Sequence, residues 1–84
     1  MHRATVHITD PVGLHARPAA VLVQTVGKFK SRIQLLHGEK QADARSIIQV
    51  LGLGVRQGNP VTVVAEGVDE EAALAAVLSV LSGQ

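Results

Sequence analysis

A histidine and an arginine stand two residues apart in the segment GLHARPAAV, residues 13–21, just before a proline and an apolar run. If a helix begins here with His15 as its N-cap, the amides of Ala16 and Arg17 have no carbonyl partner inside that helix. Free amides, the positive end of the helix dipole and the guanidinium of Arg17 together form a site for phosphate oxygens. Because a neutral imidazole is a nucleophile, the segment suggests a phosphohistidine.

The same residues also have an ordinary structural interpretation. Histidine, glycine and proline commonly gather where a loop passes into a helix, and His-x-Arg-Pro alone has no catalytic meaning. Pro18 fits a first helical turn because it has no N–H to leave unsatisfied, and its ring disfavours helical dihedrals at Arg17. The spacing alone therefore leaves a phosphoryl site and a plain helix start both open.

Hydrophobic periodicity predicts seven elements that would position this segment. Alternating apolar residues mark strands, and apolar residues at i, i+3, i+4 and i+7 mark helices. The predicted strands are 3–8, 32–35, 40–43 and 61–65, and the predicted helices are 15–27, 46–54 and one capped by Asp69 that runs to residue 81. The segment 46–54, opened by Ser46, is short enough that a buried strand remains a competing prediction.

This order predicts an α+β fold, an open-faced two-layer sandwich with a four-stranded antiparallel sheet and three helices on one face (β-α-β-β-α-β-α). With 84 residues, 46% of them hydrophobic, the chain fits a single domain spanning residues 1–84.

Composition argues against several functions. The chain has no cysteine, His2 and His7 have opposite parity on their strand, and His37 lies at a turn, so we expect no metal site and no cofactor. A net charge of +1 and a lone aromatic residue, Phe29, argue against nucleic-acid binding. No apolar run is long enough for a membrane span or a signal peptide, so a cytoplasmic location without stable membrane association is expected.

Residues 13–20, GLHARPAA, resemble the active-site signature of HPr, the histidine-containing phosphocarrier family of the phosphoenolpyruvate-dependent sugar phosphotransferase system. Residues 44–67, ARSIIQVLGLGVRQGNPVTVVAEG, resemble the family's second signature, and DEEAALAAV, residues 69–77, resembles its closing helix. The resemblance covers all 84 residues. It implies that enzyme I phosphorylates Nδ1 of His15 and that the group passes to a sugar-specific enzyme IIA. The chain would then be a monomeric carrier that is regenerated in each cycle, and not an enzyme.

In such a relay, Arg17 and the backbone of Ala16 and Arg17 would bind the phosphoryl oxygens. Apolar residues at the starts of two helices would form the partner surface: Leu14, Ala20, Ile47, Ile48 and Leu51. Helical spacing places Ile47 and Leu51 with Val50 on a face that favours burial, so Ile48 is the better contact.

Ser46 has two interpretations. As a helix N-cap its hydroxyl is worth ~1 kcal/mol, and this structural role is the default. The resemblance adds that the matching serine is phosphorylated by a dedicated kinase in some bacterial lineages, which makes a serine kinase or phosphorylase a further partner.

The chain departs from the family pattern at Val12, where members often carry a polar residue, and at the uncharged Gln24, Gly27 and Gln49. Arg17, Lys28 and Arg45 are then the local positive charges. Two alternatives stay open: a nitrogen-related or regulatory phosphorelay that uses the same His15 chemistry, and a metabolite-binding module in which His15 only hydrogen-bonds an anion.

Overall fold

The computed structural model describes residues 1–83, so residue 84 of the predicted domain lies outside the described residues. The four strands are β1 (His2–His7), β2 (Arg32–His37), β3 (Lys40–Asp43) and β4 (Pro60–Glu66). The helices are α1 (Ala16–Val26), α2 (Ile47–Gly52) and α3 (Glu70–Leu81). The predicted order of elements is confirmed.

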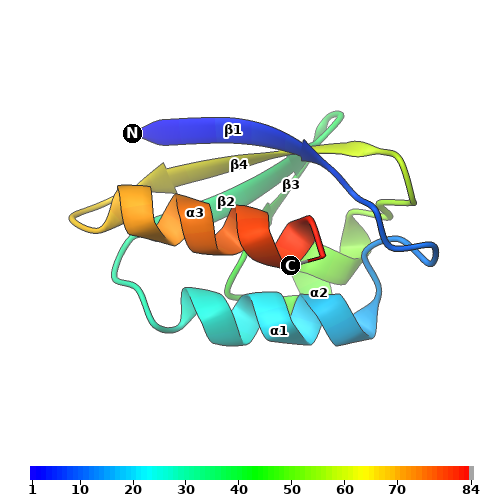
Figure 1. Cartoon of the computed structure of the whole chain (residues 1–84), viewed down its shortest axis with the longest axis horizontal. Coiled ribbons are helices and arrows are strands. Elements are labelled where there is room, and N and C mark those ends of the chain that lie inside the picture. Colours follow the sequence, from blue (N-terminus) through cyan, green and yellow to red (C-terminus); the bar gives the residue numbers. More distant parts are fainter. Residues whose placement is uncertain (84) are drawn as a thin grey trace.

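The last strand in the sequence lies in the interior of the sheet. The strand order is β1-β4-β2-β3, and each neighbouring pair is antiparallel. Figure 1 shows the helices on one side of this sheet, which leaves its other face open. The predicted open-faced sandwich is therefore the observed fold.

The core lies between the sheet and the helices. Residues of β2 and β4 alternate in burial, and the partners Leu35 and Val63 are both fully buried. The helices contribute mainly the side chains that the 3.6-residue period selects. Those with no exposed surface are Ala19, Leu22, Val26, Val50, Ala73 and Val77.

Several boundaries differ from the sequence prediction. β1 begins one residue earlier and ends at His7, although Ile8 beyond it is only 3% exposed. β2 continues to His37, so the hairpin turn is confined to Gly38 and Glu39. The segment that begins at Ser46 is a helix, as predicted. It is short, and Val50 is its one fully buried side chain.

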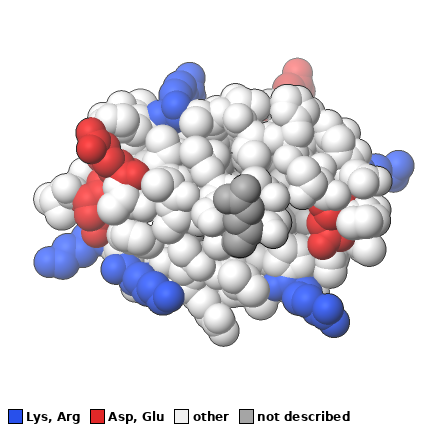
Figure 2. All heavy atoms as spheres, viewed as in Figure 1, with Lys and Arg blue, Asp and Glu red and all other residues white. Residues whose placement is uncertain are grey.

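Charged side chains avoid the middle of the face made by α1 and α3. Residues 72–83 carry no charged side chain. On the face shown in Figure 2, acidic and basic groups accordingly lie at the margins. None of the helices within residues 1–83 is long and apolar enough to cross a membrane.

Asp69 occupies the N-cap position of α3, as predicted, but its side chain makes no capping hydrogen bond to the helix. Its carboxylate accepts hydrogen bonds from the amides of Lys30 and Ser31, each at 2.9 Å, and from the Ser31 hydroxyl. The side chain thus ties the α1–β2 connection to the turn before α3 instead of capping the helix. Glu70 accepts from the Gly67 amide at 3.2 Å in the same turn.

We predict that Asp69→Asn makes the chain less stable at neutral pH but not in acid. The Ser31 hydroxyl, and then the Lys30 amide, hold the pKa of Asp69 below its ordinary value of 3.8. A carboxylate with a lowered folded pKa stabilises the fold above the unfolded pKa, and this contribution is lost as pH falls through the folded pKa.

Urea unfolding of both chains across a pH series measures the effect. The stability gap should be open at pH well above 3.8 and should close below it. Glu39→Gln, in the exposed β2–β3 turn, is the control and should show little effect at either end of the series. A gap that does not change with pH would show that the charge of Asp69 does not hold this connection.

Candidate functional site

The connection from β1 to α1, residues 8–15, is fastened to the segment that precedes β4. The amide of Leu14 donates to the carbonyl of Val55 at 3.0 Å, and the amide of Gly58 donates to the carbonyl of Ile8 at 2.7 Å. The side chains of Leu14 and Val55 are 6% and 4% exposed. Backbone bonds and burial therefore fix both ends of this connection before the helix begins.

Gly13 makes the close approach possible. Its φ is +84°, in the left-handed region, and a Cβ at this position would lie 2.5 Å from the Val55 carbonyl oxygen. Only glycine satisfies both the dihedral and the contact without displacing the neighbouring backbone. The GLH sequence thus determines where the histidine is presented.

His15 is the N-cap of α1, as predicted, and its side chain makes no capping hydrogen bond. Its carbonyl accepts from the Ala19 amide at 3.0 Å, and its backbone is extended, with φ −103° and ψ −171°. The imidazole is one-third exposed. The ring is therefore accessible to a second molecule while the backbone beneath it is held.

The backbone amides of Ala16 and Arg17 have no hydrogen-bond partner among residues 1–83. The Arg17 side chain is exposed and forms no ion pair within the same described part of the chain. Two free donors at a helix N-terminus and an unpaired guanidinium fit an oxyanion with several oxygens. The structure thus brings the predicted residues together beside His15.

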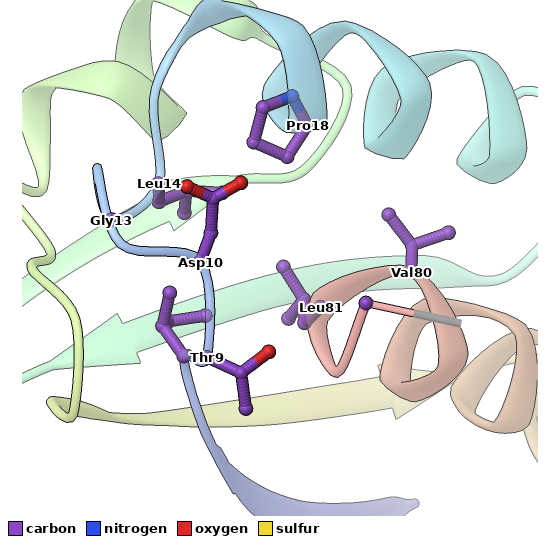
Figure 3. Close-up of a pocket in the computed structure, with 9 residues that line it drawn as sticks. Thr9, Asp10, Gly13, Leu14, Pro18, Val80 and Leu81 are labelled. Atoms are coloured by element: carbon purple, nitrogen blue, oxygen red, sulfur yellow. The ribbon is translucent and has the colours of Figure 1, made fainter.

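Sequence reasoning missed Asp10. Its Oδ2 lies 3.4 Å from Nε2 of His15, and its Oδ1 accepts the Val12 amide at 2.9 Å. Figure 3 shows the carboxylate directed toward the first turn of α1, where Pro18 lies. The available signal was the pair Asp10–Pro11 at the head of a turn, since aspartate commonly bonds the amide two residues ahead.

Asp10 is held in its charged form. The Val12 amide lowers the pKa of Asp10 below its ordinary value of 3.8, and the hydrogen bond and charge of His15 and the charge of Arg17 act in the same direction. The apolar Val12 side chain itself is 70% exposed and takes no part in this hydrogen bond, which its backbone amide makes.

The pocket beside this loop is small and mostly apolar. It encloses about 60 Å³ and is lined by apolar side chains such as Leu14, Val80 and Leu81 together with Asp10 (Figure 3). Pockets that enclose small-molecule ligands measure ≈ 300–1,000 Å³. This pocket is therefore too small to enclose a metabolite, and His15 is not among the residues that line it.

The predicted partner surface differs from the structure in two respects. Leu14 belongs to the core, because its backbone bond to Val55 draws the side chain under the loop. Ile48 is 79% exposed, as predicted. Ile47 and Leu51 were expected on the buried face, but α2 is so short that only Val50 is fully covered and both remain more than one-third exposed. Ala20 is half-buried on α1, which contacts α2 (Figure 1).

Ser46 and Arg45, at the start of α2, both have structural roles. Ser46 is the N-cap, and its hydroxyl oxygen accepts the Gln49 amide at 3.3 Å, as the capping interpretation predicted. Nη2 of Arg45 donates to the carbonyls of Phe29 at 2.8 Å and Ser31 at 3.1 Å. This guanidinium fastens the connection before β2, so it is less free to meet a partner than Arg17.

An open-faced sandwich that presents a histidine at the start of its first helix has the architecture of the small histidine phosphocarriers. The family model described as "PTS HPr component phosphorylation site" matches residues 2–82, and the chain belongs to this HPr family.

Individual relatives agree with the family model. The phosphocarrier protein HPr of Mycoplasma pneumoniae is 42% identical over 82 residues, which cover 96% of this chain and 93% of that protein. The crystal structure of HPr-C-His from Thermoanaerobacter tengcongensis superposes with a TM-score of 0.92 at 46% identity, covering 96% of this chain and 91% of that one.

A further relative has a different context. The phosphoryl donor subunit DhaM of the PEP-dependent dihydroxyacetone kinase of Providencia stuartii is 49% identical over 67 residues, which cover 80% of this chain but 14% of that subunit.

Among residues 1–83 no group of three His, Asp or Glu side chains is arranged to hold a metal ion.

We predict that Gly13→Ala destabilises the chain by more than the ordinary penalty for a left-handed residue, because it adds a clash with the backbone of Val55. Gly54→Ala is the matched control, since Gly54 has φ +66° and nothing within 4 Å of the added Cβ. The control should lose about 1–2 kcal/mol in urea unfolding, and Gly13→Ala should lose more. Equal losses would contradict the role assigned to the close approach.

Proposed function

We propose that this chain is a phosphoryl carrier in which Nδ1 of His15 accepts the phosphoryl group of enzyme I and passes it to an enzyme IIA. The observation that carries the proposal is the partly exposed imidazole of His15 beside two free amides and the unpaired Arg17, in a member of the HPr family. We expect the carrier to act as a cytoplasmic monomer without a cofactor and to be regenerated in each cycle.

The transfer step needs little from the protein beyond position and charge. The lone pair of Nδ1 attacks phosphorus, a bond from Nδ1 to phosphorus forms, and the bond from phosphorus to the donor atom breaks with its electron pair left on the donor. Arg17 and the amides of Ala16 and Arg17 face the oxygens on which charge accumulates. A carrier must also release the group, so these donors serve best when they bind the transition state more tightly than the resting phosphohistidine.

Exposed apolar residues on α2 support the docking part of the proposal. Ile47, Ile48 and Leu51 on α2 are exposed, Ala20 on α1 is half-buried, and the two helices contact each other. Small exposed apolar areas with a polar rim commonly mark partner surfaces. We propose that enzyme I and enzyme IIA use this surface in turn, which requires that neither stays bound.

Ser46 lies at the edge of the same surface, one residue before α2. We propose that a serine kinase can regulate the carrier here, because a phosphoserine at a helix N-terminus is tolerated by the helix. A dianion beside the apolar surface would repel acidic or phosphorylated partners and slow the relay.

The similarity to DhaM favours a second candidate relay with the same His15 chemistry. In that relay the carrier would serve a PEP-dependent dihydroxyacetone kinase, the system of which DhaM is the phosphoryl donor subunit. Phosphotransfer from the phosphorylated chain to purified acceptors of each system would distinguish the two.

Phosphorylation by phosphoenolpyruvate and enzyme I, followed by intact mass, tests the proposal. The chain should gain one acid-labile phosphoryl group, His15→Ala should gain none, and His7→Ala, which removes an exposed histidine on β1, should behave as the unchanged chain. Arg17→Ala should slow the reaction about 10²-fold, since removing one donor to a developing oxyanion costs that much. Arg17→Lys should recover only part of the rate because it lacks the planar fork. An equal gain of mass in His15→Ala would overturn the proposal.

The partner surface has its own test in the KM for the carrier. Ile48→Asp should raise the KM of enzyme I for the carrier about tenfold, because a central apolar contact is commonly worth more than 1 kcal/mol. Ser46→Asp should raise it too by adding charge. Val68→Asp is the control, since Val68 is 90% exposed in the turn before α3. A KM that rises equally in the control would contradict the assigned surface.

A further inference from the structure

We propose that Asp10 is a positioning residue that keeps the proton of His15 on Nε2, so that Nδ1 retains the lone pair that attacks phosphorus. This inference rests on the proposed function, because it assigns a role within the His15 reaction. The residue lies outside the GLHARPAA segment and is separated from His15 by five positions.

The chemistry of the contact sets the direction of the hydrogen bond. Oδ2 of Asp10 lies 3.4 Å from Nε2 of His15. A carboxylate only accepts hydrogen bonds, so the nitrogen that faces it must carry the proton. The tautomer of a neutral imidazole is set by the hydrogen bond that one of its nitrogens makes, and here the other nitrogen is left with its lone pair free.

The carboxylate is oriented before any partner binds. Oδ1 of Asp10 accepts the Val12 amide at 2.9 Å, and the backbone carbonyl of Asp10 accepts the Gly13 amide at 2.8 Å. Two backbone bonds therefore hold Asp10 inside the turn whose far end carries His15. Because the Val12 amide lowers its pKa, Asp10 is ionised at neutral pH and remains an acceptor.

A contact of 3.4 Å is long for a hydrogen bond to a charged group, as is common at sites without bound substrate. Positive charge develops on the ring during the reaction, which strengthens the attraction to the carboxylate. The contact is thus of the kind that stabilises the transition state more than the ground state.

The proton balance follows the same geometry. When Nδ1 forms its bond to phosphorus and the donor bond breaks, the ring becomes an imidazolium with the phosphoryl group on Nδ1 and the proton still on Nε2. No proton leaves, and Asp10 faces the new positive charge. In the onward transfer the bond from Nδ1 to phosphorus breaks, its electron pair returns to Nδ1, and the leaving group is a neutral imidazole rather than an imidazolate.

Asp10→Asn separates this role from the structure of the loop. The asparagine Oδ1 can still accept the Val12 amide, but its NH2 group replaces Oδ2 and donates, which favours the opposite tautomer. Asp10→Ala removes both contacts. Asp43→Asn is the matched control, because Oδ1 of Asp43 accepts the Arg45 amide at 2.9 Å in the same local arrangement, on β3.

Two measurements are made on each chain. Long-range ¹H–¹⁵N spectra, recorded well above the ordinary histidine pKa of about 6.5, report which ring nitrogen of His15 is protonated. The rate of phosphorylation by enzyme I is measured in parallel. The unchanged chain and Asp43→Asn should show a protonated Nε2 and equal rates. Asp10→Asn should shift the proton toward Nδ1 and lose about tenfold or more in rate, the usual cost of removing a group that orients a histidine. Its melting temperature should fall less than that of Asp10→Ala, because the asparagine Oδ1 still accepts the Val12 amide.

An Asp10→Asn chain that keeps the proton on Nε2, or that moves it without losing rate, would overturn the inference while leaving the carrier function intact. An unchanged chain that accepts no phosphoryl group would overturn the proposed function instead. The tautomer measurement needs no enzyme I and would still decide whether Asp10 sets the position of the proton.

Discussion

The contact of the β1–α1 connection with the backbone of Val55 and Arg56 is the constraint on which the site depends. Gly13 lies so close to these residues that no side chain fits between them. The Leu14 amide is bonded to the Val55 carbonyl, and the Leu14 side chain is buried beneath. The helix that follows can therefore start only at one place, and its first free amides lie beside the imidazole.

Within that frame the site combines rigid and exposed parts. The turn from Asp10 to Gly13 is closed by its own hydrogen bonds, whereas the His15 ring and Arg17 extend outward. Rigid backbone with exposed reactive groups suits chemistry that takes place between two proteins, because the partner supplies the walls that exclude water. It also explains why the adjoining pocket of about 60 Å³ can remain small without limiting the function.

Much of this architecture could be predicted because it depends on periodicity. Alternation gave the four strands, and helical spacing gave the helices and the start of α1 at His15. The errors concern contacts between residues distant in sequence. Asp69 bonds residues 30 and 31 instead of its own helix, and Leu14 is buried by a segment some forty positions away. Neither contact can be predicted from the residues next to it in the sequence.

The Asp10 contact was missed for a different reason. Its bond to Val12 is local and typical of aspartate in turns, but its approach to Nε2 depends on how the turn folds back toward the helix start. The half-exposure of Ile47 and Leu51 was missed because a one-and-a-half-turn helix has too little length to bury a full apolar face. In both cases the residue type indicated the local structure, but the contact or exposure of the side chain depended on the three-dimensional arrangement.

The place of β4 between β1 and β2 has a consequence for the order in which the chain can fold. The β2–β3 hairpin pairs residues close in sequence, but β1 pairs with the distant residues 60–65 of β4. Pairing of distant segments is slow because a long loop must close first. During synthesis β1 therefore cannot pair until β4 has been made. The loop before His15 cannot form its backbone hydrogen bonds earlier either, because their partners lie at residues 55–59. A nascent or truncated chain that ends before β4 thus lacks the residues that hold the loop around His15 in place.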